Sequence, residues 1–160
     1  MEPAVVGAII TAIVGPALTF IAKWLWDARI WNRIPERGRI ALTGKWQGEG
    51  HQDLGPEGKP ISYPLTMELR CGWKLVTGTG HVHFPLKKDP YDSTFVLQGG
   101  FFYENFLKLD FRNNSDAGKI QFGAVMLVLD SEGKTLKGKL TGYGPRSKDV
   151  VTAAVSLTKD

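Results

Sequence analysis

The sequence contains three histidines that could bind a metal ion: His51, His81 and His83. His81 and His83 stand two positions apart, so on a β-strand they would share one face and could bind a metal ion together. No cysteine or other histidine follows at a spacing that completes a ligand set. We therefore predict no metal site.

Other catalytic patterns are also missing. The sequence contains no GxxxxGK[ST] phosphate loop, and its carboxylates fall mainly at strand ends and turns, where they are more often solvated than catalytic. The single cysteine, Cys71, excludes an internal disulfide and a cysteine-rich metal site, and a free thiol suits a reducing compartment. We expect a protein that is not an enzyme and that uses no cofactor.

Composition limits the class of protein. A hydrophobic fraction of 42% and a charged fraction of 22% are ordinary for a folded chain. The net charge of +4 is spread out, without a run of five like charges, so we expect no binding to DNA or RNA. Nineteen glycines and nine prolines supply many turns and favour an all-β domain over a helical bundle.

An uncharged segment spans residues 4–22. As a helix its 19 residues would rise about 28 Å, close to the hydrocarbon thickness of a bilayer. Its apolar side chains surround the helix and leave no polar face. Lys23 ends the segment, and Trp24, Trp26 and Trp31 follow where an aromatic belt would lie at the lipid headgroups.

We predict a single transmembrane helix over residues 1–26 and a basic juxtamembrane connector over residues 27–39, in which Pro35 and Gly38 break any helix. The alternatives are a buried or interfacial helix and a cleaved signal peptide. A signal peptide carries its basic residues before the apolar segment, whereas here they follow it. Because positive flanks stay in the cytoplasm, we expect the N-terminus outside and the rest of the chain inside.

Small residues recur at every fourth position of the predicted helix. One such stripe consists of Gly7, Thr11, Gly15 and Thr19. Stripes of this kind let two helix backbones approach closely in lipid, so we predict self-association of the chain in the membrane.

Residues 40–160 are predicted to form a β-barrel domain. Two-residue alternation and turn formers recur about every ten to twelve residues, which indicates eight strands. We place them at residues 40–52, 61–71, 73–84, 94–100, 102–112, 119–129, 135–143 and 150–158. Short connections favour antiparallel neighbours, and eight such strands can close into an up-and-down barrel.

Alternation also predicts which side chains face the interior of the barrel. We assign four sets of alternate positions to it: Ile61, Tyr63, Leu65, Met67 and Leu69; Ile120, Phe122, Ala124, Met126 and Val128; Leu136, Gly138, Leu140 and Gly142; Val151, Ala153, Val155 and Leu157. The positions between them are mostly polar, so the outer wall is expected to face water rather than lipid. Glycines within the strands would either bend the sheet or open a cavity.

The first predicted strand opens with Thr43-Gly44-Lys45-Trp46, a Gly-x-Trp pattern. This resembles the opening motif of lipocalin-like barrels, in which the tryptophan closes one end. The order of membrane segment, basic connector and compact barrel resembles the transmembrane β-barrel effectors of bacterial cyclic-oligonucleotide anti-phage signalling (CBASS). Members of that family commonly have two membrane helices, whereas this sequence has one strong span.

The resemblance implies a function. In that family the barrel binds a cyclic dinucleotide, binding drives assembly, and the membrane segments then disrupt the bacterial inner membrane and stop growth of the infected cell. For this chain the resemblance implies a cyclic oligonucleotide ligand, a homo-oligomer and a place in the inner membrane.

A cyclic dinucleotide offers flat bases and phosphates, so its site should supply aromatic faces together with cationic or hydroxyl groups. The candidate ligand-binding residues are Tyr63, Trp73, Tyr103 and Tyr143 for the bases, and Arg70, Arg112, Arg146, Thr77 and Thr79 for the phosphates. Two alternatives stay open. One is a membrane-tethered, lipocalin-like carrier or sensor of a small apolar ligand such as a fatty acid, and the other is a scaffold with a filled barrel.

Overall fold

A computed structural model describes residues 19, 23, 34–55, 58–86, 90–103, 105–113, 120–144 and 148–160. The chain divides into two compact units, Met1–Arg33 and Ile34–Asp160. The predicted transmembrane helix lies outside the described residues except for Thr19 and Lys23, and so do Gly7, Thr11 and Gly15 of the small-residue stripe. Within the described residues, no helix combines the length and the apolar composition that crossing a membrane requires.

The second unit begins with a short helix, α2 (Glu36–Leu42), which starts directly after Pro35 and includes Gly38. Gly38 lies inside this helix, so the prediction that it breaks a helix is wrong, whereas Pro35 is not helical and directly precedes α2. Proline fits at this position because the first N–H groups of a helix have no partner within it. Gly38 fits because a Cβ atom there would lie 3.1 Å from the ring of Phe101, so glycine lets α2 pack closely against the barrel.

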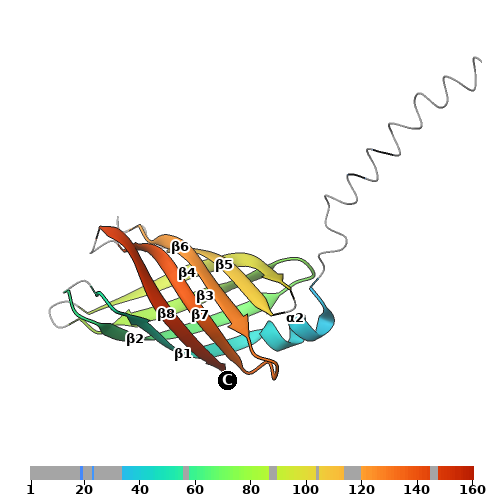
Figure 1. The fold of residues 1–160 in the computed structure, drawn as a ribbon, viewed down its shortest axis with the longest axis horizontal. Coiled ribbons are helices and arrows are strands. Elements are labelled where there is room, and N and C mark those ends of the chain that lie inside the picture. The colour runs from blue at the N-terminus through green and yellow to red at the C-terminus, as the bar shows by residue number, and fades with distance from the viewer. Residues whose placement is uncertain are drawn as a thin grey trace, which may run out of the picture. The chain divides into compact units, whose positions relative to one another are not determined.

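Eight antiparallel strands follow, and each pairs with its neighbours in sequence order. They are β1 (Gly44–Gln52), β2 (Ile61–Cys71), β3 (Val76–Phe84), β4 (Tyr91–Phe102), β5 (Phe106–Asn113), β6 (Phe122–Leu129), β7 (Thr135–Gly144) and β8 (Asp149–Lys159). β8 returns beside β1, which closes the sheet into a barrel without a free edge (Figure 1). The predicted eight-stranded up-and-down barrel is thus confirmed.

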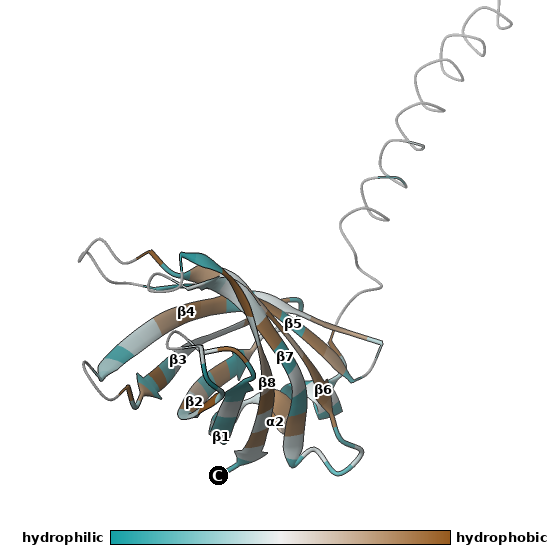
Figure 2. Cartoon of the chain, turned by 60° about the vertical axis from the view of Figure 1, so that its left-hand side comes forward, coloured by the Kyte–Doolittle hydropathy of each residue, from teal (hydrophilic) through white to brown (hydrophobic). Residues whose placement is uncertain are grey.

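Apolar and polar side chains alternate along most strands, as the banding of β2, β7 and β8 in Figure 2 shows. The inward positions of β2 were predicted correctly: Tyr63, Leu65, Met67 and Leu69 are buried, and Ser62, Thr66 and Glu68 are exposed. The predictions for β7 and β8 are also confirmed, with Leu136, Ala153, Val155 and Leu157 in the core.

The inward face of β6 was predicted wrongly. Val125, Leu127 and Leu129 are buried, whereas Phe122 and Met126, which were assigned to the interior, are exposed. Val128 is exposed as well. Both faces of this strand are apolar, so alternation gives no preference between them, and the pairing with β5 and β7 decides which face points inward.

α2 covers one end of the barrel (Figure 1), and Trp46 lies fully buried at that end, near the start of β1. The indole Nε1 of Trp46 donates a hydrogen bond of 2.9 Å to the carbonyl oxygen of Leu42, the last residue of α2. The backbone N–H of Ile34, just before the helix, donates to the carbonyl oxygen of Trp73 in the β2–β3 turn at 2.8 Å. Trp46 therefore joins the helix to the barrel core. The Gly-x-Trp pattern predicted a tryptophan at one end of the barrel, but not its link to a helix.

Candidate ligand cavity

A cavity opens at the other end of the barrel, where β1, β3 and β7 end and β2, β4, β6 and β8 begin. The volume of this cavity is about 50 Å³. The lining residues are Gln52, Tyr63, Val82, Phe84, Tyr91, Phe95, Phe111, Gln121, Leu140, Gly142, Tyr143, Gly144 and Val151. No charged side chain is among the described residues that line it.

Aromatic rings occupy one side of this cavity. Phe84 lies between two tyrosines: its ring centre is 4.6 Å from that of Tyr63 and 4.7 Å from that of Tyr91, with which it is stacked at an interplanar angle of 20°. Deeper in the barrel, Phe95 and Phe111 meet edge to face at 5.1 Å. The cavity therefore presents ring faces on which a flat ligand could stack.

Two glycines make room for these rings. A Cβ atom at Gly50 would collide with the ring of Tyr63, and one at Gly142 would lie 2.5 Å from the Cζ atom of Phe111. Elsewhere glycine serves close strand packing: at Gly48, Gly99 and Gly138 a Cβ atom would collide with the carbonyl oxygen of a neighbouring strand. The loss of side-chain volume is thus seen at Gly50 and Gly142, where aromatic rings take up the space, whereas bending of the sheet stays a prediction.

Two glutamines are the buried polar residues of this end. Gln52 is 5% exposed and Gln121 is 6% exposed. The side-chain oxygen of Gln121 accepts a hydrogen bond from Ser93, and its Nε2 lies 3.4 Å from the hydroxyl of Tyr91. Gln52 donates to the carbonyl oxygen of Leu54. An amide both donates and accepts, so these groups could read the polar edge of a bound ring.

Burial also affects a phenol in the cavity. Removal from water, together with the neighbouring Tyr91, raises the pKa of Tyr63 to about 12. Tyr63 is therefore neutral at physiological pH, and its hydroxyl can donate a hydrogen bond to a ligand as well as accept one.

Of the predicted ligand-binding residues, the structure brings Tyr63 and Tyr143 together at the cavity. Arg70, Thr77 and Arg112 are exposed at outward positions of β2, β3 and β5, and Thr79 is exposed two positions beyond Thr77. Trp73 and Tyr103 are exposed in turns at the α2 end, where the guanidinium of Arg39 lies 5.2 Å from the centre of the Trp73 ring. Arg146 lies outside the described residues, two positions after Gly144.

Sequence reasoning missed most of the lining. Phe84, Phe95 and Phe111 occupy inward or half-buried positions near strand ends, and they read from the sequence as ordinary core residues. Gln121 was missed because the wrong face of β6 had been assigned to the interior. The sequence signal that could have found it is a glutamine directly before an apolar strand.

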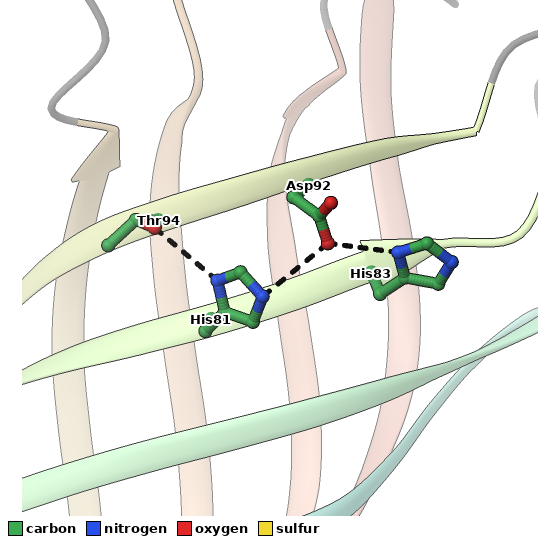
Figure 3. A network of polar contacts seen from close by, with 4 residues as sticks. All are labelled: His81, His83, Asp92 and Thr94. Carbon is green, nitrogen blue, oxygen red and sulfur yellow. Dashed lines mark hydrogen bonds and ion pairs between the residues drawn. The ribbon is translucent and has the colours of Figure 1, made fainter.

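The two histidines predicted to share a face do so, on the outer wall of the barrel. Figure 3 shows His81 and His83 of β3 on either side of Asp92 of β4. The Oδ1 atom of Asp92 is 2.9 Å from His83 Nδ1 and 3.4 Å from His81 Nε2, and His81 Nδ1 is 3.4 Å from the hydroxyl of Thr94. Among the described residues, no group of three histidine, cysteine, aspartate or glutamate side chains is arranged to hold a metal ion.

Comparison of this sequence with known proteins finds no relative. No protein-family model matches this sequence, and no curated protein matches it. The structure itself shows an eight-stranded, antiparallel, closed β-barrel.

Proposed function

We propose that this chain is a membrane-anchored sensor whose barrel binds a cyclic dinucleotide by taking a base into the end cavity. One observation supports this proposal above others: stacked rings, Phe84 and Tyr91, lie beside the amide group of Gln121. A nucleobase is a flat ring with a polar edge. Stacking on an aromatic side chain contributes about 1–3 kcal/mol per base, and amides can satisfy the edge.

Binding requires a rearrangement at the mouth. Phe84 is in contact with both tyrosines, so a base must displace one ring or stack on the free face of another. The phosphates then stay at the mouth, where Lys148 is exposed next to the cavity-lining end of β7. In the sequence, the segments that follow β3 and β7 also carry Lys87, Lys88 and Arg146. The cation of Lys148 at this rim would complement the ligand's charge.

The proposed output is assembly. In this scheme, ligand binding at the cavity promotes homo-oligomers through the stripe of Gly7, Thr11, Gly15 and Thr19, and the assembled helices disrupt the inner membrane of an infected bacterium. This part of the proposal rests on the sequence resemblance and on the uncharged segment at residues 4–22.

The test is ligand binding to the full chain in detergent. Titration calorimetry with a panel of cyclic dinucleotides should find at least one ligand whose affinity falls about tenfold or more in Gln121→Leu, because a base edge then loses its amide partner. Thr77→Val, on the outer wall, is the matched control and should bind as the unmodified chain does. The proposal fails if no member of the panel binds, or if both variants lose affinity equally.

A specific observation favours a second candidate, a membrane-tethered carrier or sensor of a small apolar ligand. Most of the cavity lining is apolar, and no charged side chain belongs to its described part. Native mass spectrometry of the purified chain separates the two candidates. A retained lipid that is lost when Leu140 is replaced by Gln would favour the carrier.

A further inference from the structure

β6 departs from the rest of the barrel because it is apolar on both faces. Its inward residues Val125, Leu127 and Leu129 belong to the core. Its outward residues are Phe122, Met126 and Val128, which are 55%, 61% and 40% exposed. A strand with a buried face and a water-facing wall normally carries polar residues on the second face.

The outward apolar residues continue onto the neighbouring strands. Val128 pairs with Phe106 of β5, and Phe106 pairs with Phe102 of β4; both phenylalanines are exposed. We call Phe102, Phe106, Phe122, Met126 and Val128 the β6 apolar face. Among the described residues of β1, β2 and β3, by contrast, no large hydrophobic side chain is exposed. Val96 of β4 and Val150 of β8 are also exposed, so the exposed large hydrophobic side chains of the described strands lie on β4, β5, β6 and β8.

Cations flank this face on both sides. Met126 pairs with Lys108 of β5 and with Lys139 of β7, so one cross-strand row reads lysine, methionine, lysine. Lys137 is the partner of Val128, and Arg112 is the partner of Phe122. Asp110 is the acidic residue among the described outward positions of β5, β6 and β7. Its Oδ1 atom lies 3.6 Å from the Nζ atom of Lys108.

We propose that the β6 apolar face docks the barrel onto the surface of an anionic lipid bilayer. Exposed phenylalanine and methionine side chains would enter the boundary between headgroups and acyl chains, as the apolar side of an interfacial element does. The flanking lysines reach past them toward lipid phosphates with their long stems along the apolar surface. The inference does not depend on the ligand of the end cavity.

The flanking charges favour a bilayer over a second copy of the chain. A two-fold contact through the β6 apolar face with its axis along the strand would set Lys108 of one copy against Lys139 of the other, because these residues occupy the same row. With the axis across the strands, midway between the rows of Lys137 and Lys139, Lys137 of one copy would face Lys139 of the other. Like charges at close range oppose both arrangements, whereas an anionic surface is complementary to all four cations.

The experiment follows a fluorescent probe on the full chain reconstituted into vesicles. Met126→Cys, in a Cys71→Ser background, carries an environment-sensitive dye on the β6 apolar face; Thr66→Cys carries it on the outward face of β2 as the matched control. The vesicles contain phosphatidylcholine alone or an equimolar mixture with phosphatidylglycerol. Docking predicts a blue-shifted probe at position 126, quenched by lipid-borne quenchers, in the anionic vesicles only, and a probe at position 66 that stays in water.

A charge-reversed variant, Lys137→Glu with Lys139→Glu, should abolish the shift, as should high salt, since both remove the attraction to anionic lipid. Circular dichroism of each variant checks that the barrel is intact. The proposal is overturned if the probe at position 126 stays in water on anionic vesicles, or if both probes respond alike. It is also overturned if the shift appears in detergent without lipid and grows with protein concentration, because the face then binds a second copy.

Discussion

The phenol of Tyr63 illustrates how position in the fold determines what a residue can do. Tyr63 and Tyr103 were proposed for the same role from sequence, yet Tyr63 is buried against Phe84 while Tyr103 is exposed in a turn. Burial disfavours the phenolate, and the pKa of Tyr63 is raised to about 12. Ionisation of Tyr63 would place a charge in an apolar cavity, so it is coupled to the stability of the fold.

That coupling predicts an alkaline loss of stability. In the unfolded chain the phenol ionises at pH 10, whereas the folded barrel holds it neutral to about pH 12. The stability that the neutral phenol of Tyr63 contributes to the fold is therefore fully present below pH 10 and is lost as the pH rises to about 12. Each pKa unit corresponds to about 1.4 kcal/mol. Between pH 10 and about pH 12, the free energy of unfolding should therefore fall by up to about 2–3 kcal/mol more in the unmodified chain than in Tyr63→Phe.

Urea unfolding of the two chains at several alkaline pH values measures the difference. Tyr103→Phe is the control, since this side chain is 89% exposed. Parallel profiles for Tyr63→Phe and the unmodified chain would contradict the prediction.

Among the elements, α2 and β1 are joined most directly through Trp46. The indole is fully buried and bonded to the carbonyl oxygen of Leu42, and the Nζ atom of Lys159 lies 5.7 Å from the ring centre. Lys159 also donates a 3.0 Å hydrogen bond to the carbonyl oxygen of Ile40, so the last strand reaches the same helix. One side chain thus links the helix, the first strand and the end of β8.

Trp46→Phe should lower the free energy of unfolding by about 1–3 kcal/mol, because it removes a buried hydrogen bond and leaves a small void. Trp73→Phe, at an exposed turn position, should change it by no more than about 0.5 kcal/mol. Thermal and urea unfolding of both variants provide the comparison. Equal effects would mean that Trp46 does not hold the α2 end together.

At the scale of the whole molecule, closure of the barrel depends on the seam between β1 and β8. This seam joins the beginning and the end of the domain, and it satisfies backbone groups that would otherwise form an open edge. Gly48 lies in the seam opposite Leu157, and a Cβ atom there would collide with the carbonyl oxygen of Ser156. The two strands can approach this closely only because position 48 has no side chain.

Gly48→Ala should therefore destabilise the barrel by about 2–3 kcal/mol, because the backbone of β8 must move away. Gly80→Ala is the matched control: its Cβ atom would meet its nearest neighbour at an ordinary 3.6 Å, and its effect should stay within about 1 kcal/mol. Hydrogen exchange should show faster opening of β1 and β8 in Gly48→Ala. Equal stability of the two variants would show that the seam adapts without cost.

The sequence by itself determined the strands and their order. The predicted strand at residues 61–71 coincides with β2, and the other seven overlap their observed counterparts, because two-residue alternation and turn formers are local signals. It did not predict α2, because the effect of proline and glycine depends on place: Pro35 starts the helix, and Gly38 makes room for Phe101 on a distant strand.

Only the tertiary structure decided the inward face of β6 and the membership of the cavity. A strand that is apolar on both sides can face either way, and its hydrogen-bonded partners on β5 and β7 choose. Tyr63 of β2, Phe111 of β5 and Gln121, just before β6, line the same cavity, and no sequence spacing encodes their meeting. Alternation is a property of each strand alone, whereas a cavity and an outer face are properties of the closed sheet, and these arise only when all eight strands are in register.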